Sequence, residues 1–330
     1  MKSLITGLTI VLGFILALLW MPPSSHASSD PVQCSDFSDR GHLNVLTINL
    51  LFSEIRQRET RLERVVDFIE AQADADEPVD LVLLQEVVGG SLSGTTNTAL
   101  ELKSLLSERG LHYNLSYRLA NGLPGALTVG NAILSRCEIV FTLSKTLPIV
   151  TEEPFDGFEI PLRRKVIMSR ISVPDFGKIN VYNTHLCAFC DPQEERLEQA
   201  EVLMRFIRNV ERRIGWDGNP IILGGDFNTN LNIEAEIPVY DLITNEGFID
   251  SYAVANQCTS CCSEDEGLDG CTFAVSGNPF TGASEDPIRI DYIFARGVMD
   301  LDILSSQVVF KEDPNWVSDH SGVLTRIRFD

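Results

Sequence analysis

An aspartate and an asparagine follow an apolar run in the stretch GGDFNTN, which covers residues 224–230. Residues 220–223 are typical of a buried strand, and two glycines separate that strand from Asp226 and Asn228. Because glycine has no side chain, the backbone here could pass close to neighbouring strands. The carboxylate and the amide would then leave the core together, where they could contact a metal ion or a phosphate.

Polar residues recur in the same setting along the chain. Each one follows or interrupts an apolar segment, where a side chain leaving the core can meet others at one edge of a rigid fold. Taken singly, each has a structural explanation as a turn residue, a cap or a satisfied buried group. Their joint occurrence favours a functional site. The set comprises Asn49, Glu86, Asn131, His185, Asp226, Asn228, Asp291, Asp319 and His320.

Carboxylate and amide oxygens dominate this set, and such ligands suit magnesium, manganese or calcium. Two histidines and no cysteine argue against a zinc cage. Hydrolysis of a phosphate ester needs a cation that polarises the phosphate, a held water, a base, and a donor for the phosphoryl charge. Asp, Asn and His can fill these roles. Asp291 is a candidate partner that would orient His320 and hold it protonated.

Two units of strand, helix and strand would position these side chains. In the first unit, apolar segments 43–52 and 79–84 flank a helix, and Thr60 with Glu63 forms a capping-box pattern that predicts its start. In the second unit, a helix that begins with the pattern of residues 191–194 separates two apolar segments. Those segments are residues 178–185 and 220–225.

Short apolar segments elsewhere bring the expected number of strands to about ten. Such a mixture, with helices between some strands, favours two sheets packed face to face with helices outside. No Pro-rich, Ser-rich or charged linker divides the chain, so one domain is expected. The additional strands are expected at residues 126–134, 162–173, 288–294, 301–310 and 322–329.

The N-terminus is typical of a secretory signal. Lys2 precedes an apolar run over residues 4–20, and a polar stretch with small residues follows, so we expect cleavage after Ala27. An uncleaved anchor is the alternative, but the run is short for a membrane span. We therefore predict a signal peptide over residues 1–27, a linker over 28–40, one catalytic domain over 41–330, and a secreted or periplasmic product.

The mature chain would be strongly acidic. Removing 27 of the 330 residues leaves 303, and the loss of Lys2 moves the formal charge from −21 to −22. Such a charge repels nucleic acid and anionic lipid at long range, so binding of phosphate would need local positive charge or metal ions.

All eight cysteines lie beyond the expected cleavage point, and an even number in an exported chain indicates disulfide bonds. Their pairing cannot be deduced from the sequence. Cys187-x-x-Cys190 and Cys258-x-x-Cys261-Cys262 would also fit zinc sites, and the first would fit a redox pair. The acidic residues at 264–266 lack the ligand spacing of a calcium loop, so a solvated loop is expected.

Seven segments, in order, resemble motifs of the endonuclease/exonuclease/phosphatase superfamily, which includes deoxyribonuclease I, exonuclease III and the neutral sphingomyelinases. The resemblance covers nearly the whole chain after about residue 40. It implies an α/β fold, a four-layer sandwich of two packed mixed sheets with helices outside. The segments are LTINL at 46–50, LLQEV at 83–87, GNAILSR at 130–136, YNTHL at 182–186, GGDFN at 224–228, RIDYIF at 289–294 and SDHSG at 318–322.

The resemblance also implies roles for the site residues. Glu86 would bind a divalent metal, Mg²⁺ or else Mn²⁺ or Ca²⁺, with Asn49 and Asp319 beside it. Asp226 and Asn228 would handle the nucleophilic water and the phosphate.

Two histidines would complete this implied site. His320, paired with Asp291, would stabilise the phosphoryl charge or protonate the leaving oxygen. His185 would face it across the scissile phosphate.

Members of the superfamily share these residues and differ in their loops, so the substrate is less well defined. Glu86 is followed by Val87-Val88-Gly89-Gly90, where deoxyribonuclease I has an arginine that contacts DNA. The Trp-Cys-Asp-Arg signature of the inositol phosphatases is absent from the sequence. Residues 163–165 loosely match a lysine-glycine segment of the sphingomyelinases, and they could equally be a solvated strand end or a phosphate contact.

We therefore expect a secreted, metal-dependent phosphoric ester hydrolase, a phosphodiesterase for a phospholipid head group or a small phosphodiester. A deoxyribonuclease I-like nuclease and an inactive binding protein on the same fold are the alternatives. A serine hydrolase is disfavoured because the sequence has no Gly-x-Ser-x-Gly elbow. No stable protein partner is implied, and a monomer is expected.

Overall fold

The computed structural model describes residues 34, 36–53, 57–155, 158–188, 190, 195–213, 219–282, 285–297 and 301–329. The predicted signal peptide, most of the predicted linker and the predicted helix start at 191–194 lie outside the described residues. Residues 33–330 form one compact unit.

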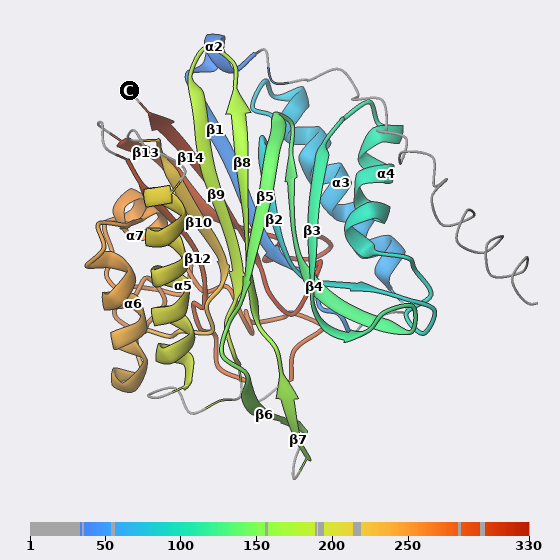
Figure 1. The fold of residues 1–330 in the computed structure, drawn as a ribbon, viewed down its shortest axis with the longest axis vertical. Coiled ribbons are helices and arrows are strands. Elements are labelled where there is room, and N and C mark those ends of the chain that lie inside the picture. The colour runs from blue at the N-terminus through green and yellow to red at the C-terminus, as the bar shows by residue number, and fades with distance from the viewer. Residues whose placement is uncertain are drawn as a thin grey trace, which may run out of the picture. The chain divides into compact units, whose positions relative to one another are not determined.

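Two six-stranded mixed sheets form the centre of this unit (Figure 1). The first sheet has the order β13 (Leu301–Val309), β14 (Gly322–Phe329), β1 (His42–Asn49), β2 (Leu81–Gly89), β4 (Leu127–Ser135) and β3 (Asn114–Leu123). The second has the order β11 (Ile249–Asp250), β12 (Asp291–Arg296), β10 (Ile221–Asp226), β9 (Gly177–His185), β8 (Lys165–Val173) and β5 (Glu138–Thr146). A separate hairpin consists of β6 (Val150–Phe155) and β7 (Phe158–Leu162).

Helices cover the outer face of each sheet (Figure 1). Helices α3 (Arg58–Asp74) and α4 (Thr98–Glu108) share an apolar cluster with the first sheet. Helices α5 (Glu195–Arg213) and α6 (Ile237–Thr244) share one with the second sheet. The fold is therefore the four-layer α/β sandwich that the sequence predicts. Shorter helices are α2 (Phe37–Arg40), η1 (Glu234–Glu236) and α7 (Ser251–Asn256).

Strand β1 shows how the sequence specifies these layers. Leu46 and Ile48 pack in the cluster under α3 and α4, whereas Leu43 and Val45 pack in the cluster between the sheets. Successive side chains of a strand point to opposite faces, so a strand covered on both sides needs apolar residues at nearly every position. This is why the central strands appear in the sequence as continuous apolar runs.

The two predicted strand–helix–strand units occur in the structure. Strands β1 and β2 are parallel, with Asn49 beside Gln85, and α3 connects them. Strands β9 and β10 are also parallel, with His185 beside Asp226, and α5 connects them. Both units therefore end their strands at the same edge of their sheets.

Several predicted boundaries are wrong. Helix α3 begins at Arg58, so Thr60 lies in its first turn, and the N-cap residue Gln57 makes no side-chain cap bond. Strand β2 does not end at residue 84, because a bulge lets it continue to Gly89. The predicted strand at 162–173 is divided, because Leu162 pairs with β6 and the next strand begins at Lys165.

The cysteines form disulfides, as predicted. All eight are paired, so no thiolate remains for zinc at either cluster. The first disulfide joins the chain before β1 to the β4–β5 connection. The pairs are Cys34–Cys137, Cys187–Cys190, Cys258–Cys261 and Cys262–Cys271.

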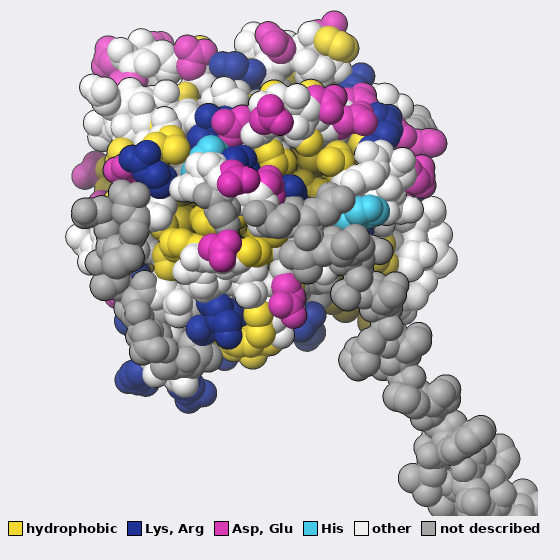
Figure 2. All heavy atoms as spheres, turned by 90° about the horizontal axis from the view of Figure 1, so that it is seen from above, with side chains coloured by type: hydrophobic (Ala, Val, Ile, Leu, Met, Phe, Trp, Pro, Cys, Tyr) yellow, Lys and Arg dark blue, Asp and Glu magenta, His cyan; other side chains and the backbone are white. Residues whose placement is uncertain are grey.

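The two ends of the sandwich differ. The end that carries α2 and the start of β1 is shown in Figure 2, where acidic and basic side chains are interspersed. The β6–β7 hairpin extends from the opposite end, where β1, β9 and β10 finish (Figure 1). Within the described part of the chain, no helix is long and apolar enough to cross a membrane.

Candidate active site

The residues singled out from the sequence lie at the end of the sandwich opposite α2. Asn49, His185 and Asp226 end parallel strands, and Asp291 begins β12 directly beside Asp226. The segment with His320 precedes β14, which runs antiparallel to β1 and so begins where β1 ends. Both sheets therefore supply residues to one edge.

Asp226 lies at the centre of this group and is buried. The Asn49 amide donates to its Oδ2 at 3.1 Å, and the Asn228 backbone N–H donates to its Oδ1 at 3.0 Å. The Nε2 atoms of His185 and His320 lie 3.4 and 3.7 Å from the same Oδ2. One carboxylate oxygen thus faces an amide and two imidazoles.

Asp291 holds the ring of His320. Its Oδ2 lies 2.8 Å from His320 Nδ1, and its backbone N–H donates to Thr272 Oγ1 at 3.1 Å. The ring of Phe273 packs against the imidazole with centroids 5.0 Å apart. Because Nδ1 is engaged by Asp291, Nε2 is the atom that His320 presents to Asp226. The buried Oδ1 of Asp291 has no partner among the described residues.

A bulge in β2 sets the direction of Glu86. The register with β4 shifts between Leu84 and Val87, and Glu86 has φ +54°, in the left-handed region. Bulges of this kind re-aim a side chain at the edge of a sheet. The Phe52 backbone N–H donates to Glu86 Oε2 at 2.8 Å, and the side chain remains partly exposed.

The inner residue of the same bulge joins the two sheets. Gln85 Nε2 donates to Asn183 Oδ1 at 2.7 Å across the buried interior. Asn183 Nδ2 donates in turn to the carbonyls of Leu84 and Ala132 at 2.9 and 2.8 Å. These bonds fix the first sheet against the second directly below the candidate site.

The glycines before Asp226 permit close approach, as the sequence indicates. A Cβ added to Gly224 would lie 2.6 Å from the Leu83 side chain of the opposite sheet. At Gly225, where φ is +134°, an added Cβ would lie 2.1 Å from the Thr184 carbonyl oxygen. Side chains at these positions would push β10 away from its neighbours and move Asp226.

Asn228 and Asn131 differ from the other predicted residues in their contacts. Asn228 has φ +50°, and its amide donates to the Leu186 carbonyl at 3.1 Å. Together with the bond from its N–H to Asp226, this geometry is the turn that Asp-x-Asn alone predicts. Asn131 donates to the Lys165 carbonyl at 2.8 Å and so links β4 to β8.

The two histidines have opposite protonation tendencies. Burial, with the charges of Arg164 and His320, lowers the pKa of His185 well below its ordinary value. Burial also disfavours the charge on His320, but Asp291 and Asp226 outweigh it and raise the pKa of that imidazole well above its ordinary value. Neighbouring groups with pKa values driven apart are typical of an acid and a base in one site.

The pKa values of Asp226 and Glu86 are both raised. Burial and the charge of Asp291 raise the pKa of Asp226 to about 7, although His320 and Asn49 oppose this shift. Burial and the charge of Asp319 raise the pKa of Glu86. Carboxylates placed close together and out of water favour binding of a cation or a proton.

Two separate groups of side chains fit a divalent metal. Asp226, Asp291 and His320 offer ligand atoms that all lie within 4.8 Å of one another. Glu86 and Asp319 are partly exposed and repel each other, so a cation between them would relieve that repulsion. Oxygen donors in both groups suit a hard ion such as Mg²⁺.

Sequence reasoning missed Thr272 and Phe273, which support Asp291 and His320. These residues lie in a cysteine-rich loop without strand periodicity, and their only regular pairing consists of bridges from Phe273 to Ile288 and His320. The available signal in the sequence was Cys271 itself, and the structure shows that its disulfide with Cys262 fixes the loop immediately before Thr272.

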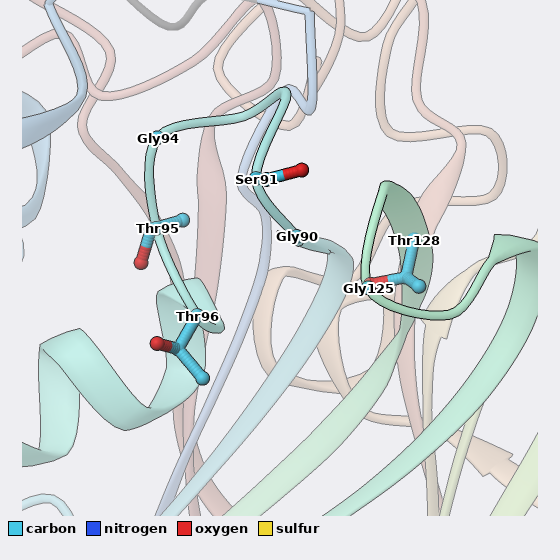
Figure 3. Close-up of a pocket in the computed structure, with 7 residues that line it drawn as sticks. All are labelled: Gly90, Ser91, Gly94, Thr95, Thr96, Gly125 and Thr128. Atoms are coloured by element: carbon cyan, nitrogen blue, oxygen red, sulfur yellow. The ribbon is translucent and has the colours of Figure 1, made fainter.

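A cavity of about 480 Å³ lies further along β2, between the β2–α4 loop and the β3–β4 turn (Figure 3). Its first residue, Gly90, is four positions beyond Glu86. Its lining has hydroxyl and backbone groups but no titratable side chain, so it cannot supply acid or base catalysis. The lining residues are Gly90, Ser91, Gly94, Thr95, Thr96, Gly125 and Thr128.

Several solved structures share this fold at low sequence identity. An endonuclease/exonuclease/phosphatase family protein from Leptotrichia buccalis is 21% identical, covers 87% of this chain and 100% of its own, and has a TM-score of 0.62. Danio rerio TDP2, solved with a single-strand DNA product, is 17% identical with coverage of 87% and 99% and a TM-score of 0.61. A mannosyl-6-phosphatase from Bacteroides thetaiotaomicron is 19% identical with coverage of 87% and 100% and a TM-score of 0.57.

No curated protein matches the chain. The model of the Endonuclease/Exonuclease/phosphatase family, in contrast, matches residues 46–320, which include every candidate site residue. With this match across most of the sequence, the chain belongs to the endonuclease/exonuclease/phosphatase family of phosphoester hydrolases.

Proposed function

We propose that this chain is an exported, divalent-metal-dependent phosphodiesterase that acts on small phosphodiesters, phospholipid head groups among them. The observation that carries this proposal is the position of Asp226 Oδ2. It faces His185 at 3.4 Å and His320 at 3.7 Å, two imidazoles with opposite protonation tendencies. A neutral imidazole and a cationic donor thus face the same oxygen of one buried carboxylate.

In the proposed reaction, Asp226 accepts the proton of the attacking water. A base with a pKa near the working pH is effective in this role, and the pKa of Asp226 is raised to about 7. Asn49 holds the carboxylate in place through its amide bond. Asn228, partly exposed beside it, is positioned to contact a phosphate oxygen.

His320 carries the positive charge in this reaction. Asp291 keeps its ring oriented through Nδ1 and favours its protonated form. The protonated ring donates through Nε2 to the phosphoryl oxygens or to the leaving oxygen. His185, kept neutral, completes the other side of the phosphate.

Glu86, Asp319 and Asn49 are the residues that we expect to hold the metal. The Glu86 and Asp319 oxygens lie at the partly exposed rim, where a phosphate can reach a bound ion, and the buried Asn49 ends the neighbouring strand β1. A divalent cation there would polarise the phosphate oxygens and offset their charge. Leu51 supports this arrangement, because its backbone N–H donates to Asn49 Oδ1 at 3.0 Å.

The substrate class rests on charge and on the segment after Glu86. The formal charge of −21 disfavours long-range attraction of a polyanion. The segment Val87-Val88-Gly89 continues β2 and offers no cation to a nucleic-acid backbone. Export is supported by the four disulfides, which are typical of oxidising compartments.

The test is hydrolysis by the purified chain, in magnesium and in chelator, of bis-p-nitrophenyl phosphate, sphingomyelin vesicles and double-stranded DNA. Chelator-sensitive turnover of the chromogenic diester, with or without release of phosphocholine, is expected. An Asp226→Ala preparation serves as the control for contaminating hydrolases. Preferential cutting of DNA would replace the proposal with a nuclease, and metal-independent ligand binding without turnover would indicate a binding protein.

A further inference from the structure

Three cationic side chains gather beside the candidate active site, and they are called the basic cluster here: Arg118, Arg163 and Lys165. Hydrogen bonds and strand pairing fix their backbones. The Asn131 amide donates to the Lys165 carbonyl at 2.8 Å, and Arg118 lies opposite Asn131 in the β3–β4 pairing. Arg163 exchanges two bonds with the Asn121 side chain, at 2.9 Å through its N–H and 2.7 Å through its carbonyl.

The positive charges of Arg118 and Arg163 act on Lys165. Burial, and then the charges of Arg118 and Arg163, lower the pKa of Lys165, with no acidic side chain among the causes. Among the ion pairs of the described residues, none includes a member of the basic cluster. This grouping is unexpected in a chain with 47 acidic and 26 basic residues. A bound anion would relieve the repulsion.

The basic cluster adjoins the catalytic group through two strands. Ile167 pairs with Asn183, which places Lys165 beside the end of β9, where His185 lies. Arg164, which lies between Arg163 and Lys165 in the sequence, acts electrostatically on both Glu86 and His185. Neighbouring strands lie about 5 Å apart, so the backbone of Lys165 lies roughly one strand spacing from the end of β9. Arg118 belongs to β3 of the other sheet.

We infer that the basic cluster binds a second phosphate of the same small substrate molecule, one that is not cleaved. This inference rests on the proposed function and narrows its substrate class to phosphodiesters that carry another phosphate a few bonds from the scissile one. Arg118 and Arg163 provide the outer contacts, and Lys165 provides the contact nearest the active site. A zwitterionic head group such as phosphocholine lacks the charge that this arrangement recognises.

Two chromogenic esters with an identical scissile bond test the inference. They are the p-nitrophenyl ester of thymidine 5′-phosphate and the same ester carrying an additional 3′-phosphate. The purified chain in magnesium should show a kcat/KM at least about tenfold higher for the ester with the added phosphate, mainly through a lower KM. Arg118→Gln combined with Arg163→Gln should reduce that ratio to about one. Arg205→Gln, which removes an exposed positive charge from α5, should leave the ratio unchanged.

A binding measurement keeps the inference testable apart from turnover. By calorimetry, thymidine 3′,5′-bisphosphate should bind about tenfold tighter than thymidine 5′-phosphate, and the double variant should lose this difference. Equal binding of the two nucleotides would overturn the inference even if both esters are hydrolysed. Tighter binding of the bisphosphate, together with no hydrolysis of either p-nitrophenyl ester, would support the inference and refute the proposed function. Single-stranded oligonucleotides that bind tighter than the bisphosphate would overturn it in favour of a polynucleotide phosphate.

Discussion

Asp291 Oδ2 lies 2.8 Å from His320 Nδ1, and both side chains are buried. The carboxylate comes from the start of β12 in the second sheet, whereas the imidazole comes from the loop before β14 in the first. The pair thus spans the two sheets and determines which ring nitrogen of His320 faces Asp226. It also favours the charged form of His320, so its loss should alter how activity depends on pH.

Asp291→Asn should move the alkaline limb of the pH–rate profile to lower pH. The Asp291 carboxylate raises the pKa of His320, so its removal lets the imidazole lose its proton earlier as pH rises. We expect kcat to fall roughly 10- to 100-fold near neutral pH and further at higher pH. Profiles of kcat from about pH 5.5 to 9.5 measure this shift. Asp302→Asn, at an exposed ion pair, is the control and should retain the wild-type limb.

The stability of Asp291→Asn relative to wild type should depend on pH in a defined direction. A pKa raised by folding stabilises the native state below the ordinary value of 6.5, and this contribution is lost as pH rises through the raised value. The melting temperature of Asp291→Asn should therefore lie furthest below wild type in acid, and the gap should close at alkaline pH. A gap that does not depend on pH would show that the pair is only a packing contact.

Asp226→Asn should lose turnover by about 10³-fold or more while it retains the fold, because an amide cannot accept the proton of water. The same change should raise stability relative to wild type as pH rises from about 4 to 7, since over that window the carboxyl ionises in the unfolded chain while burial keeps it protonated in the native state. Single-turnover rates and thermal melts measure both effects. Near-normal rates would remove Asp226 from the proposed mechanism.

Glu86→Gln should weaken metal activation. The substitution removes a ligand charge at the partly exposed rim, so the magnesium concentration for half-maximal activity should rise about tenfold or more. Glu59→Gln, at an exposed position in the first turn of α3, provides the matched control. An unchanged activation constant in Glu86→Gln would place the ion instead with Asp226, Asp291 and His320.

Gly225→Ala should destabilise the fold by roughly 2 kcal/mol or more, because alanine would meet the Thr184 carbonyl and adopt a strained φ. Gly282→Ala, where the added Cβ has only ordinary contacts, should change stability little. Urea unfolding of both variants gives the comparison. A stable Gly225→Ala protein with wild-type activity would contradict the requirement for close approach at this position.

The sequence predicted the layers and the parallel units because apolar runs and strand–helix alternation are local signals. Strand ends at His185 and Asp226 were predicted well, since a polar side chain interrupts each run. The bulge at Glu86 was not predicted, because it depends on a register shift against β4 that no local pattern encodes. The start of α3 differs from the prediction because the helix begins at Arg58, whose guanidinium contacts the Ser93 carbonyl and Glu101, so that Thr60 lies inside the first turn.

Contacts between segments that are distant in the sequence could not be predicted from local patterns either. The sequence suggested Asp291 as partner of His320 only as a candidate, and it gave no indication of Thr272 or Phe273. Phe273 belongs to a loop whose position depends on its bridges to Ile288 and His320. The residue types of the site could therefore be predicted from the sequence, whereas the residues that support them, Thr272 and Phe273, could be identified only in the structure.

The buried bond between Gln85 and Asn183 implies that catalysis and folding are lost together. Asn49 and Glu86 belong to the first sheet, and His320 lies in the loop that leads into β14 of that sheet, whereas His185, Asp226 and Asp291 belong to the second sheet. Neither half can therefore bind and cleave alone. Local fraying of one sheet that breaks this bond would separate the halves before much secondary structure melts. In a denaturant titration, residual activity should thus decline no later than the far-ultraviolet circular dichroism signal. Turnover would then report whether the two sheets are still joined in their native arrangement.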